Sequence, residues 1–584
     1  MSDSHDNQQE DIQYIRHSLA HALAAAVIEL YPHAKPTIGP ATETGFYYDF
    51  DFADGEQVSE DDLPKIEEKM REVLKSWDSF DGVEVSVEEA KERFQNNPYK
   101  LELIDEISDA KEKITFYTSG TFTDLCRGGH VESAANIDPR AFKLSSVAGA
   151  YWRGDENNQM LTRIYGLAFH TKQEITDHLK QLEEAAKRDH RKLGKELNLF
   201  TFSDLVGPGL PLFTPKGATM RNAIIDKIYA IQKPYGYQNV WIPHITKPEL
   251  YKTSGHWEKF GDELFKVYGK ESEFVMKPMN CPHHTQIYAS SAKSYRDLPV
   301  RFTEATTNYR DEQTGELLGL SRVRSLTQDD GHVFCTPEQV ESEIDNIADV
   351  IKQFYTSLDM YSEGNYRVFL SVRDPKTPDE YLGDPTRWDE AEQTLKTIAE
   401  KRGLPYVVEE GEAAFYGPKL DFMFKDAIGR EWQLATIQLD FVMPGRFELE
   451  YTAEDGSKKT PVMIHRAIAG SLERFLSVII EHFAGAFPTW LAPVQTRVIP
   501  VNSEAHGEYA KTVGTSLEQS NVRVDVDDSN ESLGKRIRNA KKEKIPYLLV
   551  VGDKEKENET VSAESRDDGD LGAMHIPELV EKIG

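Results

Sequence analysis

Apolar residues recur along the chain at spacings that predict both helices and strands. Residues 15–31 and 60–77 have the three- and four-residue spacing of helices, whereas residues 45–52 (GFYYDFDF) are typical of a strand. A loop-rich segment that includes residues 126–130 comes later. Together these patterns predict an α+β domain over residues 1–170.

The pattern changes beyond that domain. Residues 171–199 are helical and strongly charged, as expected of a helical linker between domains. Residues 200–490 alternate helices with strands of the antiparallel type, and residues 491–584 have the strand, helix and strand of a compact α/β domain. We therefore expect a multi-domain protein of mixed α+β and α/β class.

Composition limits where nucleic acid could bind. Among the 584 residues, 68 Lys and Arg against 99 Asp and Glu give a formal net charge of −31. A surface this acidic argues against non-specific nucleic-acid binding, so any such site must be local. Residues 187–195 and 535–544 are basic runs that could form one, although such a run is more often a solvated helix face.

Cysteine content and hydropathy indicate the compartment. Cys126, Cys281 and Cys335 are too few and too widely spaced for a disulfide framework. The chain opens on acidic, polar residues, and no stretch has the ~18 uninterrupted apolar residues that a membrane span needs. We expect a cytoplasmic protein that does not enter the membrane.

Residues 322–332 (RVRSLTQDDGH) are the most informative stretch of the sequence. As a strand with a repeat of two, the stretch would place polar side chains on one face, namely Arg322, Arg324, Gln328, Asp330 and His332. Guanidinium, amide, carboxylate and imidazole groups on one face suit the floor of a pocket that binds an anion and a zwitterion. The alternative is an edge strand with an exposed polar face.

Two flanking segments add arginines. Arg310 and Arg322 stand at the two ends of a glycine-containing loop between predicted strands, as a pair of phosphate-binding guanidiniums would. Residues 465–483 predict one helix, with an apolar stripe that leaves Arg474 free to point elsewhere. The chain lacks a P-loop motif and a strand-linked GxGxxG, so neither P-loop nor Rossmann nucleotide binding is indicated.

These arginine-bearing segments resemble motifs 2 and 3 of the class II aminoacyl-tRNA synthetases, in which antiparallel strands bind ATP. Within that class, KPMNCPHH, TQDDGHVF and PVMIHRAI resemble the zinc-ligand segments of the threonyl-tRNA synthetase family. The segments DLCRGGH, SVAGAYWRGDENNQMLTRIYG and FPTWLAPVQ extend the resemblance over nearly the whole chain.

The resemblance implies a fold and a function. It implies an N-terminal α+β editing domain (1–170), a helical linker (171–199), a class II antiparallel-sheet catalytic core (200–490) and a C-terminal α/β anticodon-binding domain (491–584). The implied activity is a threonine–tRNA ligase that forms threonyl-adenylate from ATP and threonine and transfers the threonyl group to tRNA(Thr). Hydrolysis of mischarged seryl-tRNA(Thr) would be a second activity.

Carried over by position, the resemblance implies roles for residues in the core. Arg310 and Arg474 would contact the ATP phosphates, with Arg322 near the γ-phosphate and Glu312 by the adenine; Mg²⁺ would accompany ATP. The expected catalytic residues are Arg310, Arg322, Gln328, Asp330, Tyr416, Gln438 and Arg474. The other residues expected to bind ATP or line its pocket are Lys419, Gln433 and Ser471.

The resemblance also implies a metal site. Cys281, His332 and His465 would bind one Zn²⁺ per subunit, with one coordination position open for substrate. Their spacing resembles no zinc finger, so spacing alone does not indicate a metal.

A second His/Cys set lies near the N-terminus. His17 and His21 are four residues apart in a predicted helix and share a face, and Cys126 and His130 repeat that spacing. On the residues alone, a zinc site and chance placement both stay open. The resemblance implies a third interpretation, a metal-free editing site for the 3′ end of mischarged tRNA, formed by His17, His21, Lys100, Asp124, Cys126 and His130.

In the last domain, Arg538 and Glu555 match positions that the family uses to read the anticodon. Three positions depart from the family pattern: Glu564 stands where an arginine is usual, Gly129 replaces a proline, and His283 replaces a glycine. Because the chain begins close to the predicted editing domain, we expect the form of the family that lacks the small ubiquitin-like domain of many members.

Pro243 falls in motif 1, whose strand and helix build a two-fold interface in this class, so we expect a homodimer with ATP, threonine and tRNA(Thr) as partners. Two other functions stay open. A metal-dependent hydrolase centred on the N-terminal His/Cys set would leave the arginines unexplained, and a non-catalytic tRNA-binding paralogue would have no need of them.

Overall fold

The computed structural model describes residues 2–52 and 56–583, which form two compact units that divide between Glu183 and Glu184. Each unit has its own hydrophobic core. Among the described residues, no helix is long and apolar enough to cross a membrane.

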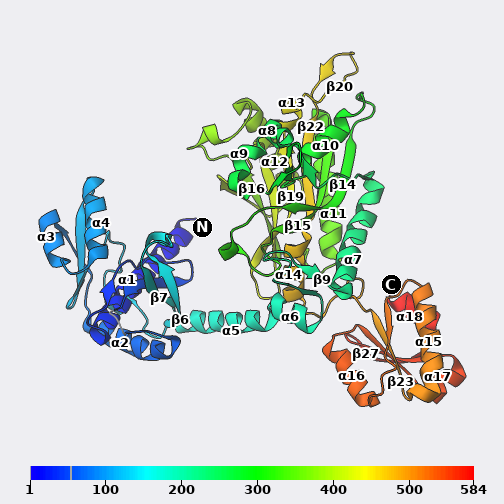
Figure 1. Ribbon diagram of the computed structural model, residues 1–584, viewed down its shortest axis with the longest axis horizontal. Helices are drawn as coiled ribbons and strands as arrows, with labels where there is room; N and C mark the ends of the chain where they lie inside the picture. The colour runs from blue at the N-terminus through cyan, green and yellow to red at the C-terminus, as the bar shows by residue number, and fades with distance from the viewer. Residues whose placement is uncertain (1, 53–55, 584) are drawn as a thin grey trace. The chain divides into compact units, whose positions relative to one another are not determined.

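The first unit is an α+β assembly around an antiparallel sheet with the strand order β1-β2-β7-β6 (Figure 1). The strands are β1 (Lys35–Pro36), β2 (Gly45–Asp51), β6 (Phe142–Tyr151) and β7 (Met160–Ala168). Helices α1 (Ser2–Leu30) and α2 (Leu63–Ser76) pack on this sheet, and the alanine-rich stretch of α1 is almost completely buried. The helices and the strand predicted from residues 15–77 are therefore confirmed.

A second, three-stranded sheet carries the DLCRGGH segment. It consists of β3 (Asp81–Val85), β4 (Ile114–Ser119) and β5 (Phe122–Leu125), with α3 (Val87–Arg93) and α4 (Pro98–Asp109) beside it. Cys126 follows directly after β5, and its amide donates to Thr115 O at 3.1 Å. The position of the cysteine is therefore fixed by strand pairing.

The predicted helical linker is two helices, α5 (Lys172–Arg188) and α6 (His190–Glu196). Asp189 separates them, because its backbone is non-helical and its carboxylate accepts a hydrogen bond from Arg191 N at 2.7 Å, which caps α6. The division between the two units falls within α5.

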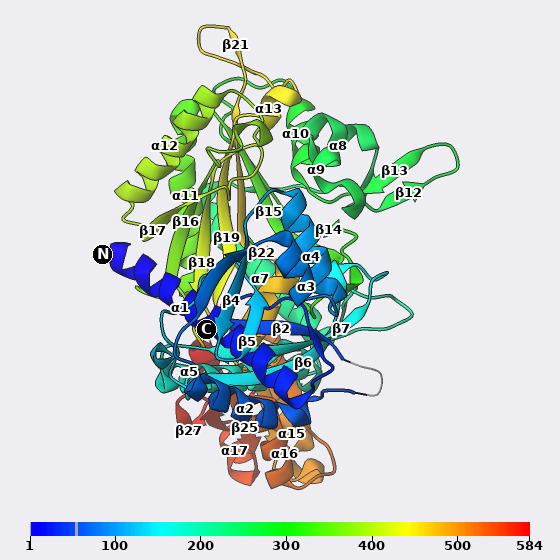
Figure 2. The same ribbon diagram turned by 90° about the vertical axis from the view of Figure 1, so that its left-hand side faces the viewer.

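The second unit is built on an eight-stranded sheet with the order β10-β14-β15-β22-β19-β18-β16-β17 (Figures 1 and 2). All its inner pairs are antiparallel, and only β10 with β14 and β16 with β17, at the two edges, are parallel. The strands are β10 (Gln238–Asn239), β14 (Val300–Tyr309), β15 (Ser325–Cys335), β16 (Tyr366–Val372), β17 (Tyr406–Glu410), β18 (Lys419–Lys425), β19 (Glu431–Asp440) and β22 (Val462–Ser471).

Besides α6, four helices contribute apolar residues to the core against this sheet. They are α7 (Pro215–Gln232), α11 (Val340–Thr356), α12 (Pro385–Lys401) and α14 (Leu472–His482). The smaller elements are β8 (Phe200–Thr201), β9 (Leu212–Phe213), β11 (Ile245–Thr246), α8 (Pro248–Ser254), α9 (His256–Phe260), β12 (Lys266–Tyr268), β13 (Glu273–Met276), α10 (Cys281–Ala289), α13 (Met443–Arg446), β20 (Tyr451–Thr452) and β21 (Lys458–Lys459).

Two predictions for the second unit are wrong. Residues 465–483 are not one helix: the first part belongs to β22, where pairing with β15 and β19 on both sides outweighs local helix propensity, and Gly470, with φ +61°, makes the turn into α14. Arg322 and Arg324 are not on β15 but precede it, because their amides bond to Leu318 O and Gly209 O in a loop.

The end of the second unit has a sheet of its own, with the order β24-β23-β25-β26-β27 and separate apolar clusters. The strands are β23 (Thr496–Pro500), β24 (Val524–Val526), β25 (Tyr547–Val551), β26 (Val561–Ser565) and β27 (Gly569–Met574), and the helices are α15 (Ser503–Gln519), α16 (Leu533–Lys542), α17 (Asp553–Asn558) and α18 (Ile576–Ile583). The predicted strand, helix and strand of this α/β region are confirmed.

Candidate active sites

A cavity of about 380 Å³ lies over the middle strands β15, β22 and β19 of the eight-stranded sheet. Most of the residues predicted for the core line it: Arg310, Gln328, Asp330, His332, Tyr416, Gln433, Gln438, His465, Ser471 and Arg474. Within β15, Leu326, Gln328, Asp330 and His332 all do so, which confirms the alternation predicted for that strand. Four predicted residues do not line the cavity: Cys281, Glu312, Arg322 and Lys419.

The carboxylate of Asp330 is held in place by a buried relay. Asn280 Nδ2 donates to Asp330 Oδ2 at 2.9 Å, and Lys277 Nζ donates to Asn280 Oδ1 at 2.8 Å. Burial lowers the pKa of Lys277 to about 8. Beside it, Asn308 Nδ2 donates to Gln328 Oε1 at 2.5 Å, so the polar floor of the cavity is oriented before any ligand binds.

Two guanidiniums face the cavity without an ion pair in the described part of the chain. Arg310 lies over the Phe260 ring at 5.0 Å and its buried Nε has no hydrogen-bond partner. Arg474 lies 5.9 Å from the Trp432 ring, and burial lowers the pKa of both arginines. A guanidinium that lines a cavity without a counterion favours an anionic ligand.

Arg322 and Lys419 are engaged elsewhere. Arg322 Nε donates to Glu312 Oε2 at 2.7 Å, and its guanidinium also reaches Glu316 at 3.1 Å. Lys419 Nζ donates to Asp421 Oδ2 at 2.5 Å. Both cations are therefore neutralised in this structure, unlike Arg310 and Arg474.

Cys281, His332 and His465 meet at one side of the cavity, with ligand atoms that all lie within 4.8 Å of one another. His332 Nε2 is 3.1 Å from His465 Nδ1. The outer ring nitrogens have partners of their own, since His465 Nε2 lies 2.8 Å from Asp440 Oδ2 and His332 Nδ1 lies 2.7 Å from His284 Nδ1. One thiol and two imidazoles, each imidazole held from behind and facing a cavity, fit a three-ligand zinc site with an open position.

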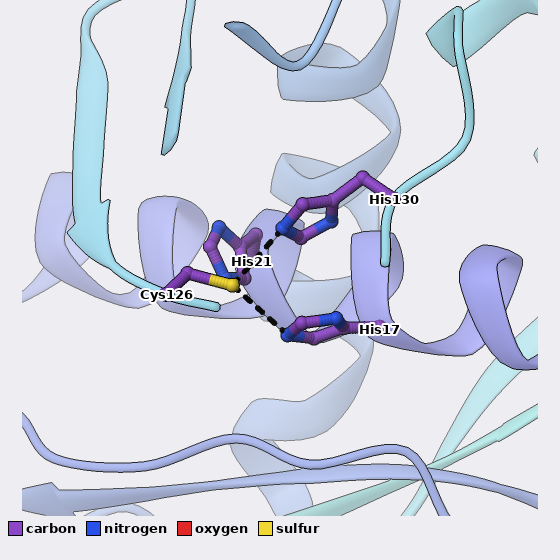
Figure 3. A group of neighbouring side chains, drawn as sticks. All are labelled: His17, His21, Cys126 and His130. Atoms are coloured by element: carbon purple, nitrogen blue, oxygen red, sulfur yellow. Dashed lines mark hydrogen bonds between the residues drawn. The ribbon is translucent and has the colours of Figure 1, made fainter. Parts of the chain in front are cut away.

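A second cavity, of about 580 Å³, lies in the first unit. Five of the residues predicted for editing line it: His17, His21, Lys100, Asp124 and Cys126. His130 does not line it but contacts Cys126 (Figure 3).

The thiol of Cys126 lies between two imidazoles, 3.4 Å from His17 Nε2 and 3.3 Å from His130 Nε2 (Figure 3). The opposite nitrogens of these rings are held by the loop and by α1, since His17 Nδ1 lies 3.2 Å from Gly129 O and His130 Nδ1 lies 3.2 Å from Ser18 Oγ. His21 is buried against both rings.

Burial sets the charge of this cluster. It lowers the pKa of His130 to about 2, lowers that of His21 well below the usual range, and raises that of the Cys126 thiol to about 11. Imidazoles that stay uncharged at neutral pH can accept hydrogen bonds from a water and so hold it in place, whereas a thiol with so high a pKa is a poor nucleophile. The cluster therefore suits the activation of a water better than attack by sulfur.

A buried ion pair stands beside the cluster. Lys100 Nζ lies 2.6 Å from Asp124 Oδ1, and Tyr48 OH donates to Asp124 Oδ2 at 2.5 Å. Tyr48 is not among the predicted residues, although a tyrosine between Phe46 and Phe50 on the buried face of a strand signals that its hydroxyl has a partner. Asp440 and His284 are likewise not among the predicted residues.

Gly129 explains how this loop differs from the proline-containing form. Gly128 and Gly129 have φ values of +98° and +85°. Proline is locked near −65°, so the backbone that brings Gly129 O to His17 requires a glycine here.

At the C-terminal end, Arg538 is exposed on α16, whereas Glu555 accepts a hydrogen bond from Gly552 N at 2.9 Å. Glu564 pairs with Lys541 at 2.6 Å, so part of the basic run on α16 is neutralised by the residue that departs from the family pattern.

Models of known protein families match three parts of the chain. Residues 265–483 match the tRNA synthetase class II core domain (G, H, P, S and T), residues 495–584 the anticodon binding domain, and residues 114–165 the threonyl and alanyl tRNA synthetase second additional domain. A solved RNA binding domain of threonyl-tRNA synthetase from Cryptosporidium parvum Iowa II is 37% identical, with a TM-score of 0.64, over 68% of this chain and 97% of that one. A prolyl-tRNA synthetase from Giardia lamblia, at 18% identity and a TM-score of 0.53, shares the fold.

Whole-chain relatives are closer. A threonine–tRNA ligase from Rubrobacter xylanophilus is 52% identical over 96% of this chain and 86% of its own length. One from Gloeobacter violaceus is 51% identical over 98% of this chain and 92% of its own. With a class II core, an anticodon-binding domain and an editing domain in one sequence, the chain belongs to the threonine–tRNA ligase family.

Proposed function

We propose that the cavity over β15, β22 and β19 is where threonine and ATP react. The observation that supports this most directly is that Arg310, whose Nε is buried, and Arg474 line the same cavity as two members of a His/Cys cluster, and that neither arginine has an ion pair in the described part of the chain. The arginines would bind the ATP phosphates, with Mg²⁺, and Asp330 would accept a hydrogen bond from the threonine amino group. The threonine carboxylate would then attack the α-phosphate in line, and pyrophosphate would leave.

Within this proposal, Gln328, Tyr416 and Gln438 surround the threonine, whereas Gln433 and Ser471 line the rest of the pocket. Arg322 and Lys419 keep the roles that the resemblance implies only if ATP displaces their present carboxylate partners. Glu312 would be freed in the same step and could then approach the adenine.

Cys281, His332 and His465 would hold one Zn²⁺. When bound, the ion would offer a coordination position to the threonine amino and hydroxyl groups, which valine cannot fill because it lacks the hydroxyl. Asp440 and His284 orient the two imidazoles from behind.

The cavity of the first unit would hydrolyse seryl-tRNA(Thr). Serine differs from threonine by one methyl, which is worth only ~1 to 3 kcal/mol of discrimination, so a second, hydrolytic site is needed. His17, His21, Cys126 and His130 would place the water, and Lys100 with Asp124 and Tyr48 would bind the terminal nucleotide and the aminoacyl group.

We also propose the domain limits 1–170, 171–199, 200–490 and 491–584, with Arg538 and Glu555 near the anticodon. Replacing Lys542, for which no ion pair is described, by alanine should reduce the salt dependence of tRNA binding by about one unit of log–log slope, as expected for one lost phosphate contact. Lys541→Ala should have the smaller effect, because Glu564 already neutralises Lys541. Equal effects would remove this assignment of the basic run.

A cytoplasmic homodimer is the proposed form of the enzyme. Trp241, Pro243 and Ile245 alternate with less exposed residues in motif 1, and Trp241 and Ile245 are 75% and 46% exposed. A contiguous apolar edge of this kind favours a partner.

Threonine-dependent exchange of pyrophosphate into ATP tests the central proposal. We expect exchange with zinc-loaded protein and threonine, and none with valine. Absence of exchange with threonine would overturn the ligase assignment of this cavity.

A further inference from the structure

The other face of β15 carries a buried ion pair that the proposed chemistry does not use. Asp329 lies between Gln328 and Asp330, which line the cavity, and Arg466 lies next to His465 on the neighbouring strand. Both side chains are 2% exposed or less, and Arg466 NH1 donates to Asp329 Oδ2 at 3.1 Å and to Asp329 O at 2.8 Å. Because burying two charges is costly, we look for a geometric role rather than a gain in stability.

That role is visible in the pairing of β15 with β22. Gln328 pairs with Ser471 and Asp330 pairs with Ala467, so β22 uses two extra residues opposite Asp329. Such a bulge leaves backbone amides without strand partners. The carboxylate of Asp329 accepts both of them, from Ile468 N at 2.9 Å and from Ala469 N at 2.8 Å.

The bulge determines where the next residues lie. It leads through Gly470 to Ser471, whose hydroxyl caps α14 by accepting from Arg474 N at 3.4 Å. Gly470, Ser471 and Arg474 all line the cavity. Moving the bulge would therefore move the guanidinium of Arg474.

Arg466 in turn is fixed from outside the two strands. Its second terminal nitrogen donates to Gln232 Oε1 on α7 at 2.6 Å and to the Thr303 hydroxyl on β14. A side chain at Gly331 would collide with it, since a Cβ there would lie 2.5 Å from Arg466 Nε. The absence of a side chain at this position thus makes room for the guanidinium.

We propose that Asp329, held by Arg466, is a positioning residue for the ATP side of the active site: it fixes the bulge of β22 and thereby places Ser471 and Arg474. This inference rests on the proposed function of the cavity. The threonine side should be independent of it, because Asp330 is held separately by Asn280 and Lys277.

Asp329→Asn tests the proposal with little change of shape. The amide NH₂ cannot accept a hydrogen bond from Ile468 N or Ala469 N, so one amide of the bulge loses its partner. In pyrophosphate exchange we expect the KM for ATP to rise at least about tenfold. The KM for threonine and the zinc content should stay within twofold of the wild type.

Glu343→Gln is the matched control. Glu343 is also buried and forms a bidentate ion pair with Arg301, at 2.6 and 2.7 Å, but it accepts no amide of the bulge. Both variants should unfold at a lower temperature, and only Asp329→Asn should change the KM for ATP. If Asp329→Asn does not fold, Thr303→Val replaces it as the test, because it removes one hydrogen-bond partner of Arg466. We expect this variant to raise the KM for ATP two- to fivefold and to leave the KM for threonine unchanged.

The proposal is overturned if the KM for ATP stays within twofold, or if the KM values for ATP and threonine rise together as for a general loss of structure. A wild-type protein without threonine-dependent exchange would instead refute the proposed function of the cavity. Deacylation of seryl-tRNA, which we assign to the first unit, is measured for every variant as a control that this unit is folded.

Discussion

The chain contains two clusters of histidine and cysteine that look alike by composition and differ in their surroundings. In each, the ligand atoms lie within 4.8 Å of one another. The cluster of the first unit has four donors and that of the second has three, so a count of donors alone would favour metal in the first. The neighbours of the two clusters indicate the opposite.

In the second unit a carboxylate, Asp440, contacts the outer nitrogen of His465, as the outer partner of a metal-bound imidazole commonly does. In the first unit the nearby carboxylate, Asp124, is engaged by Lys100 and Tyr48 and contacts none of the four donors at ion-pair distance within the described residues. The groups behind the donors therefore favour the proposed zinc at the second cluster and the proposed water at the first.

Metal content gives the largest expected difference. Wild-type protein should hold one equivalent of zinc, Cys281→Ala close to none, and the matched variant Cys126→Ala one. Loss of several kcal/mol of substrate stabilisation should reduce threonine activation by Cys281→Ala about a thousandfold. Two equivalents in the wild type, or loss of zinc from Cys126→Ala, would break the comparison; elemental analysis and pyrophosphate exchange measure both quantities.

The reverse experiment removes the editing imidazoles. His17→Ala combined with His21→Ala should slow deacylation of pre-formed seryl-tRNA about 100-fold, because the attacking water would lose two of the imidazoles that position it. Threonine activation and zinc content should not change. His33→Ala, at an exposed position just after α1, is the control, and deacylation by the double variant at the wild-type rate would remove the editing assignment.

Asp440→Asn and Asp124→Asn make the same change, from a carboxylate to an amide, beside the cluster of the second unit and beside that of the first unit, respectively. The first should weaken zinc binding about 10- to 100-fold, since it removes the carboxylate behind a ligand. The second should leave zinc binding unchanged and impair only deacylation. Competition with a chelator measures the affinity, and an equal effect of both variants on zinc would contradict the distinction drawn here.

The smallest effect is expected from pH. Because the pKa of His21 and that of His130 are lowered by burial, and that of Cys126 is raised to about 11, deacylation should vary little between pH 6 and 8. An imidazole with the ordinary pKa would be only about one-quarter neutral at pH 6. A rate profile with a midpoint near 6.5 would show that an exposed histidine acts instead.

The lowered pKa values of His21 and His130 also predict how the stability of the first unit changes with pH. Since these histidines bind protons less readily folded than unfolded, acidification below about pH 6.5 favours the unfolded state, and the first unit should lose stability there. Thermal unfolding of the wild type and of the double histidine variant at pH 5 and 7 measures this loss, which should be smaller in the variant.

The spacing of apolar residues was sufficient to predict α1, β2, α2 and the elements of the α/β region at the end of the chain, because those segments bury one face at a regular spacing. It failed for residues 465–483, where strand pairing on both sides overrides the helical pattern of the sequence. The alternation of β15 was predictable, but its start was not, because the loop contacts of Arg322 and Arg324 come from residues distant in sequence. Tyr48, Asp440 and His284 could not be predicted for a related reason. Each supports a site residue that is distant in sequence, so its role becomes visible only when the fold brings the two together.

The alternation of side chains along β15 limits which mutations this strand can accept. Its even-numbered side chains from Gln328 to His332 line the cavity, whereas Thr327 and Asp329 hold the neighbouring strand and helices. Thr327 does so through its hydroxyl, which accepts from Arg221, and its backbone amide, which donates to Glu473. Deleting one residue between Thr327 and His332 would exchange the two sets over part of the strand. Natural variation in this stretch should therefore proceed by substitution, and length changes should accumulate in the loop that ends before Ser325.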